Sequence, residues 1–321
     1  MISAETVKRW ARQAGFLACG ITDLSPNAHA DALDRWLAAG YGGTMRYIHR
    51  QAKKRKQPAL VDADARSAVV VLDNYYYDDS LQNREPPKVA KYARGKDYHD
   101  TMGARLELLA SRLREAGASH TRCYVDAGPI PERELARRAG LGWIGKNAML
   151  IRPGAGSFFF IGEILTDLEL DLDVPFETDH CGSCTRCLEA CPTGAIVEPR
   201  VVDATRCISY LTIEQKGPIP ADLATRMDGW VFGCDICNDV CPWNVRFAGR
   251  QGEQGEQEDG PGGPGGPGGR VKRILASIER MTEEEFELHF ADTPFSRPGL
   301  SGMRRNMKAA CAERSTLDPR P

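Results

Sequence analysis

CGSCTRCLEACP, residues 181–192, is the stretch that decides the fold of this 321-residue chain. Its cysteines follow the spacing C-x2-C-x2-C-x3-C-P, with thiols at Cys181, Cys184, Cys187 and Cys191. This spacing is typical of [4Fe–4S] ligands, because the first three thiolates bind one cluster and the fourth reaches a second cluster. The stretch therefore predicts a small cysteine-rich region that holds iron–sulfur clusters.

A second cysteine run completes the predicted ligand set. It reads CDICNDVCP and carries Cys234, Cys237 and Cys241. The missing first cysteine would stand at position 231, where the chain has Val231, and Cys207 is the candidate replacement. The crossed arrangement predicts one cluster on Cys181, Cys184, Cys187 and Cys241, and another on Cys191, Cys207, Cys234 and Cys237. Zinc is the alternative, but four-cysteine zinc sites use separated C-x2-C pairs, which these runs do not match.

Composition narrows the classes of function. Eleven cysteines in a chain without an apolar leader indicate metal binding or redox chemistry in a reducing compartment, so we expect a cytoplasmic protein. The net charge of −2 excludes a protein that coats nucleic acid by bulk charge, and no apolar stretch is long enough to span a membrane. The remaining cysteines have no motif spacing and are expected to be buried apolar side chains: Cys19, Cys123 and Cys311.

Helical and extended patterns alternate upstream of the cysteines. The spacing predicts helices over 5–14, 28–39, 100–116 and 131–139, and strands over 16–21, 67–72, 120–125, 148–151 and 158–166. This alternation predicts an α/β or α+β domain over roughly the first 170 residues. Further helices are expected over 282–289 and 302–312.

Four segments follow from these patterns. We expect an amino-terminal catalytic domain over 1–174 and a ferredoxin-like domain with two [4Fe–4S] clusters over 175–245. A disordered Gly/Pro-rich linker is expected over 246–270, and a short helical segment over 271–321. Because a dicluster module needs only about 70 residues, the long amino-terminal domain is expected to hold a second redox centre.

Asp126 is the candidate acid of that domain. It follows a predicted strand, and we expect it at the lip of a parallel-type sheet, where such sheets present ligands. An acid that donates a proton at neutral pH needs a raised pKa. The alternative is a capping role for the helix that begins near Pro131.

Several stretches together resemble the epoxyqueuosine reductase family. They are KYARGKDYH at 91–99, YVDAGP at 124–129, AGLGWIGKN at 139–147, GSFFFIGE at 156–163 and CISYLTIEQKGPIP at 207–220. The resemblance spans roughly residues 45–245 and keeps the cysteines in register. It implies a cobalamin-binding domain, related to the reductive dehalogenases, that precedes the dicluster domain.

The resemblance also implies an activity. The family reduces the epoxide of epoxyqueuosine, at the wobble position of tRNA, to queuosine. Cob(I)alamin is the reductant, two [4Fe–4S] clusters renew it, and Asp126 matches the family's proton donor. The cobalt is expected to have no axial protein ligand, although DYHDTMG at 97–103 nearly spells D-x-H-x-x-G. Candidate contacts to the corrin are Arg50, Tyr98, His99, Asp126, Lys146, Asn147 and Ser157.

A tRNA substrate calls for basic contacts. The candidates are the run at 53–56, Lys216 after Cys207, and Arg304 with Arg305 on the last predicted helix. Charge runs are more often solvated faces. The chain resembles a short form without the helical-repeat domain that longer family members add.

Two other functions remain open at the level of sequence. One is a different corrinoid iron–sulfur reductase, such as a dehalogenase, and the other is a dicluster electron carrier without catalysis. The expected partners are tRNA and a low-potential electron donor such as flavodoxin or ferredoxin. The protein is expected to act as a monomer without a membrane.

Overall fold

A four-stranded sheet forms the centre of the amino-terminal half. The computed structural model describes residues 2–77, 85–247, 271 and 273–310. The strand order is β1-β2-β7-β4, and each neighbouring pair is antiparallel. The strands are β1 (Ala18–Thr22), β2 (Ser67–Asn74), β7 (Phe159–Thr166) and β4 (Thr121–Val125). The predicted mixture of helices and strands is confirmed, but the parallel-type sheet is wrong, because each sheet neighbour runs in the opposite direction.

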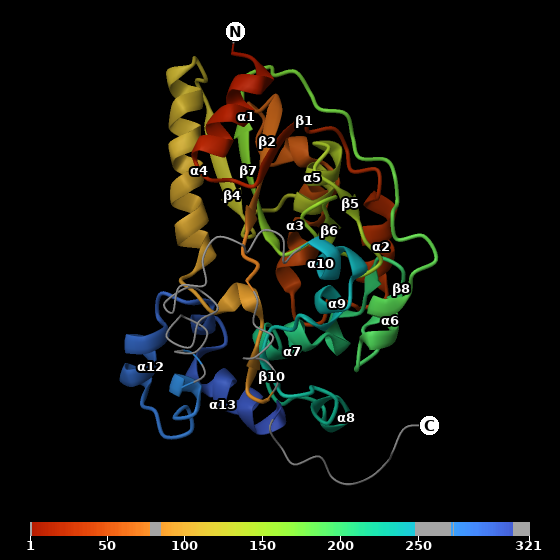
Figure 1. Ribbon diagram of the computed structural model, residues 1–321, viewed down its shortest axis with the longest axis vertical. Coiled ribbons are helices and arrows are strands. Elements are labelled where there is room, and N and C mark those ends of the chain that lie inside the picture. Colours follow the sequence, from red (N-terminus) through yellow and green to blue (C-terminus); the bar gives the residue numbers. More distant parts are fainter. Residues whose placement is uncertain (1, 78–84, 248–270, 272, 311–321) are drawn as a thin grey trace.

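Helices cover both faces of this sheet. Side chains alternate along β2, so Val69 and Val71 face α1 and α4 while Val70 and Leu72 face α5. Figure 1 shows α1 and α4 on one side of the sheet and α5 on the other. The interior of β2 is therefore buried from both sides, which explains its unbroken apolar run. The bounds are α1 (Ala4–Gln13), α4 (Tyr98–Glu115) and α5 (Glu132–Arg138).

Two further helices follow β1. The helix α2 (Ala30–Ala38) is as predicted, whereas α3 (Arg46–Lys56) was not predicted. The sequence RYIHRQAKKRK of α3 has no acidic residue, and no side chain of this helix is fully buried. Because α3 has no apolar face, its sequence shows no helical period of apolar residues, and only the basic run at 53–56 is distinctive.

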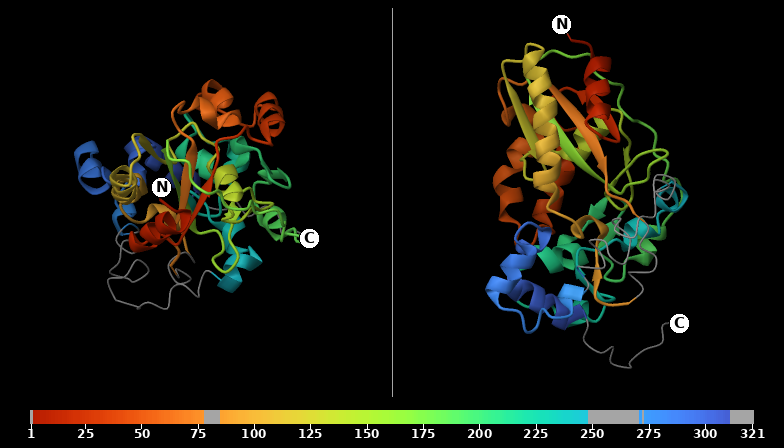
Figure 2. Two further views of the ribbon diagram at one scale, coloured as in Figure 1. Left: turned by 90° about the horizontal axis from the view of Figure 1, so that it is seen from above. Right: turned by 60° about the vertical axis from the view of Figure 1, so that its left-hand side comes forward.

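The cysteine-rich part consists of short elements joined by loops. They are β5 (Trp143–Ile144), β6 (Leu150–Ile151), α6 (Arg186–Ala190), β8 (Ile196–Glu198), β9 (Val201–Val202), α7 (Ile208–Ile213), α8 (Ala221–Ala224), β10 (Trp230–Phe232), α9 (Ile236–Asp239) and α10 (Pro242–Phe247). The predicted strand over 148–151 is half of the β5–β6 hairpin. Figure 2 shows these elements below the sheet and beside the carboxy-terminal helices.

The carboxy-terminal segment packs on the rest of the chain. It contains α12 (Glu283–Phe290) and α13 (Gly299–Ala310), and Thr282 begins α12 with a capping box to Glu285. Phe290 and Phe295 pack with Phe232 of β10 and with Val89 of β3 (Lys88–Val89). The predicted linker lies outside the described residues from 248 to 270, and so does Cys311. Among the helices that the structure describes, none is long and apolar enough to cross a membrane.

Candidate redox and acid site

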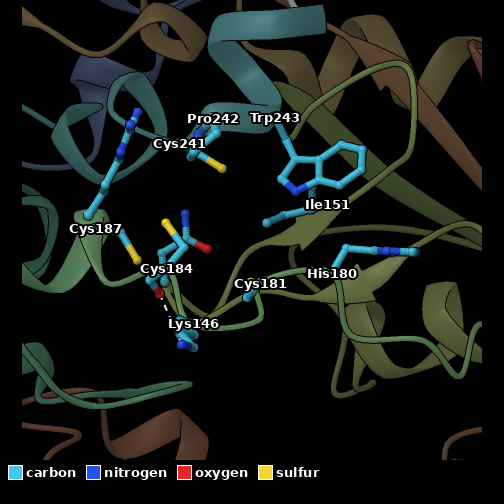
Figure 3. Close-up of a pocket in the computed structure, with 11 residues that line it drawn as sticks. Lys146, Ile151, His180, Cys181, Cys184, Cys187, Cys241, Pro242 and Trp243 are labelled. Carbon is cyan, nitrogen blue, oxygen red and sulfur yellow. Dashed lines mark hydrogen bonds between the residues drawn. The ribbon is translucent and has the colours of Figure 1, made fainter.

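The first predicted cysteine group surrounds one cavity. Cys181, Cys184, Cys187 and Cys241 line a space of about 130 Å³ together with His180 and Trp243. Figure 3 shows the sulfur atoms of Cys184, Cys187 and Cys241 turned toward this space. Three of the thiols come from the first run, whereas Cys241 comes from the second run, at the start of α10. This is the crossed grouping that the sequence predicts.

The cavity fits an iron–sulfur cluster better than a single metal ion. In the described part of the chain, no three His, Cys, Asp or Glu side chains converge closely enough to hold one ion. The four thiols instead enclose a volume, as a multi-iron cluster requires. The Trp143 indole N–H also donates to Cys181 Sγ at 3.4 Å, the kind of contact that stabilises a ligated sulfur.

The second predicted cysteine group is Cys191, Cys207, Cys234 and Cys237, and all four are half-buried. Burial raises the pKa of Cys237, and the neighbouring Cys207 and Cys191 raise it further. Burial also raises the pKa of Cys234, with contributions from Cys237 and Cys207. Cys187 of the first group also raises the pKa of Cys237, so the cysteines of both groups lie in one region of the protein.

Three predicted corrin contacts are instead engaged within the protein. The Lys146 ammonium donates to the carbonyl oxygens of Gly182 and Cys184, at 2.7 and 2.9 Å, and so holds the first cysteine loop. Ser157 and Asn147 are buried, and both bond the side chain of Asn238. Their polar groups tie the amino-terminal domain to the second cysteine loop, which leaves the predicted corrin contact without support at these three positions.

Asp126 occupies a strained turn at the end of β4. Its φ is +57°, and the Ala127 N–H bonds the Val125 carbonyl oxygen at 2.5 Å across it. This is a γ-turn with a left-handed central residue, a conformation that costs free energy and recurs at functional sites. The turn projects the carboxylate into a group of polar side chains, and 51% of the Asp126 side chain is exposed.

Three polar side chains surround the Asp126 carboxylate. The Tyr98 hydroxyl donates at 2.7 Å, Arg297 donates at 3.4 Å, and His99 Nε2 lies at 3.6 Å. Burial would raise the pKa of Asp126, but the hydrogen bonds from His99 and Tyr98 and the charge of Arg297 outweigh it and hold the pKa well below its usual range. The expectation of a raised pKa is therefore wrong for this state, in which Asp126 is ionised.

His99 has protein partners at both ring nitrogens. Nδ1 lies 2.6 Å from Asp97, and Nε2 lies 2.9 Å from Arg297. Asp126 raises the pKa of His99, partial burial lowers it, and Asp97 raises it again, so the net direction is upward. Asp97, not His99, caps α4 by accepting from the His99 backbone N–H. Both ring nitrogens of His99 therefore have partners within the protein.

Arg297 is the residue of this site that the sequence did not indicate. It follows the short helix η5 (Pro294–Ser296), about 170 positions after Asp126, and bonds Asp126, Tyr98 and His99. No local motif surrounds it, so only packing of the carboxy-terminal segment reveals its role.

The predicted RNA contacts divide into two groups. Arg304 donates to the carbonyl oxygens of Ile278 and Met281, and Arg305 donates to those of Leu211, Gln215 and Gly217. These guanidinium groups fix α13 to the protein, so contact of Arg304 and Arg305 with RNA stays a prediction. Lys216, Lys53 and Lys54 are exposed instead, as is Arg50, which was predicted to contact the corrin.

Cys19 and Cys123 behave as predicted for structural thiols. Both pack against the core between α1, α4 and the sheet, and burial raises the pKa of each to about 12. They are therefore protonated at neutral pH and poor metal ligands.

Two protein-family models match the chain. Residues 180–244 match a model described as 4Fe-4S double cluster binding domain, and residues 55–127 match one described as Epoxyqueuosine reductase QueG, DUF1730. An epoxyqueuosine reductase of Cyclobacterium marinum is 40% identical over 94% of this chain and 95% of its own length. One of Pseudomonas aeruginosa is 40% identical over 95% of this chain and 83% of its own length.

Solved structures of epoxyqueuosine reductases are also similar to this chain. A crystal structure of an epoxyqueuosine reductase with an epoxyqueuosine-modified tRNA-Tyr stem loop has a TM-score of 0.82 and 31% identity. That comparison covers 96% of this chain and 80% of the other. The structure from Streptococcus thermophilus has a TM-score of 0.81 and 26% identity, with the same coverage of each chain.

Proposed function

Because the chain belongs to the epoxyqueuosine reductase family, we propose that it reduces epoxyqueuosine to queuosine in tRNA. The observation that carries the proposal is the position of an acid site next to the cysteine groups. Tyr92 is half-buried between them: its ring centroid lies 6.1 Å from that of Tyr98, which bonds Asp126, and the backbone N–H of the preceding Lys91 bonds Asp235, beside Cys234. A reduction that consumes electrons and protons requires this proximity.

The reaction defines what the site supplies. Conversion of an epoxide to an alkene breaks two C–O bonds, consumes two electrons and two protons, and releases water. Bound cobalamin supplies a strong reductant, and two [4Fe–4S] clusters, held by the two cysteine groups, supply electrons singly from a flavodoxin or ferredoxin. The chain's own residues supply the protons and the orientation of the substrate.

Asp126 delivers a proton to the oxygen that leaves. In the free protein Arg297, Tyr98 and His99 hold it as a carboxylate. A bound RNA brings phosphates that attract Arg297 and place negative charge near Asp126, and both effects raise the pKa of a carboxyl. In the free protein His99 Nε2 lies 2.9 Å from Arg297 and accepts from it, so His99 can pass a proton to Asp126 only after Arg297 has moved away.

We expect Arg297→Met to move the pH dependence of turnover to higher pH, because the carboxylate loses a positive neighbour, its pKa rises and it keeps its proton to higher pH. The measurement is the pH–rate profile of anaerobic enzyme, with iron content as a check of the clusters. Arg297→Lys keeps the charge but loses the planar fork, so it should fall between the two. A profile of Arg297→Met that overlays the wild type would exclude this role.

The basic helix α3 is the proposed docking surface for tRNA. Its Tyr47 is 37% exposed, and Arg55 of the same helix contacts the segment that follows Asp126, so the helix lies near the acid site. Lys53 and Lys54 are exposed on the same helix, whereas Arg55 donates to the carbonyl oxygens of Gly128 and Ile130. An exposed aromatic ring beside basic side chains suits an anticodon loop, whose bases stack and whose phosphates need cations.

We expect Lys53→Met/Lys54→Met to weaken binding of the tRNA stem loop and to reduce the dependence of log K on log salt by about 1 to 2 units, because each phosphate contact contributes about 0.7 to 0.9. Fluorescence anisotropy at several salt concentrations measures this slope. Arg9→Met/Arg12→Met on α1 is the matched control and should leave the slope unchanged. If both variants have the same slope of log K against log salt, α3 does not contact the tRNA.

The function is tested on protein purified without oxygen. We expect about eight irons and one corrin per chain, and conversion of epoxyqueuosine to queuosine in tRNA by mass spectrometry of the nucleosides. Iron without corrin binding would favour an electron carrier, and corrin-dependent dehalogenation without action on the RNA would favour the other reductase. We further propose that the protein acts as a monomer in the cytoplasm, where tRNA is modified.

A further inference from the structure

Trp143 holds its indole against the first cysteine group. It lies on β5, opposite Ile151 of β6, and is 3% exposed. Its indole N–H donates to Cys181 Sγ at 3.4 Å. A buried indole N–H needs a partner, but the sulfur of a neutral thiol is a weak acceptor, whereas a thiolate carries charge and accepts more strongly. The contact therefore suits the ligated form of Cys181 better than the free thiol.

The backbone around Trp143 fixes this contact. A side chain at Gly142 would overlap the Ile151 carbonyl oxygen, and one at Gly145 would overlap the Ile151 side chain. These glycines therefore let β5 lie close to β6. Lys146, which follows, donates to two carbonyl oxygens of the first cysteine loop. The indole and the ammonium group of one short segment thus hold the same loop, so the orientation of the indole toward the sulfur is well defined.

Three aromatic rings pack around Trp143. The distances between its ring centroid and theirs are 5.8 Å for Phe176, 5.0 Å for His180 and 4.9 Å for Trp243. Cys241, the ligand from the second run, belongs to the same apolar cluster. Figure 3 shows His180 and Trp243 beside the cavity that the cysteines line. These rings leave little of the indole to water, and a hydrogen bond to a charged sulfur is stronger where water is scarce.

The contact is specific to the first cysteine group. In the described part of the chain, the Trp36 N–H donates to the Val202 carbonyl oxygen, and the buried Trp230 N–H has no partner. Among residues 2–77, 85–247, 271 and 273–310, the indole that donates to a cysteine sulfur is that of Trp143. This hydrogen bond therefore acts on one of the two clusters and not on the other.

We propose that the Trp143 N–H raises the reduction potential of the cluster bound by the first cysteine group. Reduction adds an electron, and so negative charge, to a cluster and its sulfur ligands. A donor to one of these sulfurs stabilises that charge and favours the reduced form. The electron comes from the low-potential donor protein, and no covalent bond forms or breaks at Trp143, which is a positioning residue because it acts through the cluster. The inference rests on the proposed function, in which both clusters pass electrons singly to bound cobalamin.

The test compares Trp143→Phe with the wild type in protein that is purified without oxygen and carries both clusters. A redox titration followed by electron paramagnetic resonance gives the potential of each cluster, and the first cluster is the one that Cys181→Ala lacks. At a fixed potential, the ratio of reduced to oxidised first cluster should fall about threefold to tenfold in Trp143→Phe. For one electron this corresponds to a potential about 28 to 59 mV lower. The potential of the second cluster should not change.

Trp243→Phe is the matched control, because it removes a second indole that packs against His180 and Trp143 but is not the donor to Cys181. Its first-cluster potential should stay near that of the wild type. Benzothienylalanine at position 143 keeps the shape of tryptophan and has sulfur in place of the N–H, so it should lower the potential as Trp143→Phe does while the packing persists. With nitrogen-15 in the indoles, pulsed electron paramagnetic resonance should detect a nitrogen coupling to the first cluster that Trp143→Phe loses and Trp243→Phe keeps.

A first-cluster potential that is the same in the wild type, Trp143→Phe and the benzothienyl variant would overturn the inference. Equal shifts in Trp143→Phe and Trp243→Phe would also overturn it, because the loss of a ring, and not of the N–H, would then lower the potential. The titration contains neither RNA nor corrin, so its result is separate from the proposed function. A protein that does not act on epoxyqueuosine still reports both potentials, whereas an active protein without the shift contradicts only the role of Trp143.

Discussion

Cys241→Ala removes one whole iron–sulfur cluster, although Cys241 lies in the second cysteine run. The expected iron content falls from about eight to about four atoms per chain, and turnover falls roughly a hundredfold or more, because the route for single electrons is interrupted. The reason is the cavity that Cys241 shares with Cys181, Cys184 and Cys187. Iron analysis and electron paramagnetic resonance of the reduced protein measure the effect.

The crossed grouping makes the experiment sharper. Cys181→Ala and Cys241→Ala should lose the same cluster and leave the same residual spectrum. Cys191→Ala and Cys234→Ala should both lose the other cluster and share a different residual spectrum. Cys123→Ala, which removes a thiol outside both groups, should keep all of the iron. If Cys181→Ala and Cys191→Ala instead left the same residual spectrum, each run would build its own cluster, and the assignment of ligands would be wrong.

Asp126→Asn is expected to lower turnover by about 10² to 10⁴, the usual contribution of a positioned acid. Asparagine has the same shape and accepts the left-handed backbone at this position, where φ is +57°, so clusters and fold should persist. It cannot pass a proton from His99 to substrate. The measurement is single-turnover reduction of the modified base, with iron and corrin contents determined on the same sample.

Asp228→Asn is the matched control for this substitution. Asp228 also has a positive φ, of +49°, but pairs with Lys88 away from the acid site. Turnover of Asp228→Asn should stay near that of the wild type. Unchanged turnover in Asp126→Asn would show that the strained turn has another purpose.

The Asp126 carboxylate also has a signature in stability. Its pKa is lowered in the folded protein, so it stabilises the fold above its unfolded value, near pH 4, and this contribution is lost as pH falls further. Asp126→Asn should therefore show a flatter dependence of unfolding temperature on pH in acid than the wild type.

The elements of the amino-terminal domain were largely predictable. The apolar period of α4 and the buried run of β2 depend on nearest neighbours along the chain, and both lie where the pattern predicts them. Strand direction was not predictable, since an apolar run buried on both faces suits parallel and antiparallel sheets alike. The helix α3 was not predicted, because polar contacts such as that of Lys56 with Asp34 stabilise it. Such contacts leave no period of apolar residues in the sequence.

By itself, the sequence determined the cysteine spacing, the grouping of the ligands and the choice of Asp126, because a ligand loop is a local feature whose geometry follows from residue spacing. Only the tertiary structure decided the partners of those residues. Hydrogen bonds join three of the predicted corrin contacts to the cysteine loops: Lys146, Asn147 and Ser157. Backbone carbonyl oxygens accept from two predicted RNA contacts, Arg304 and Arg305. Arg297 reached the Asp126 site from a distant segment, and the charge state of that carboxyl depends on what folding places around it.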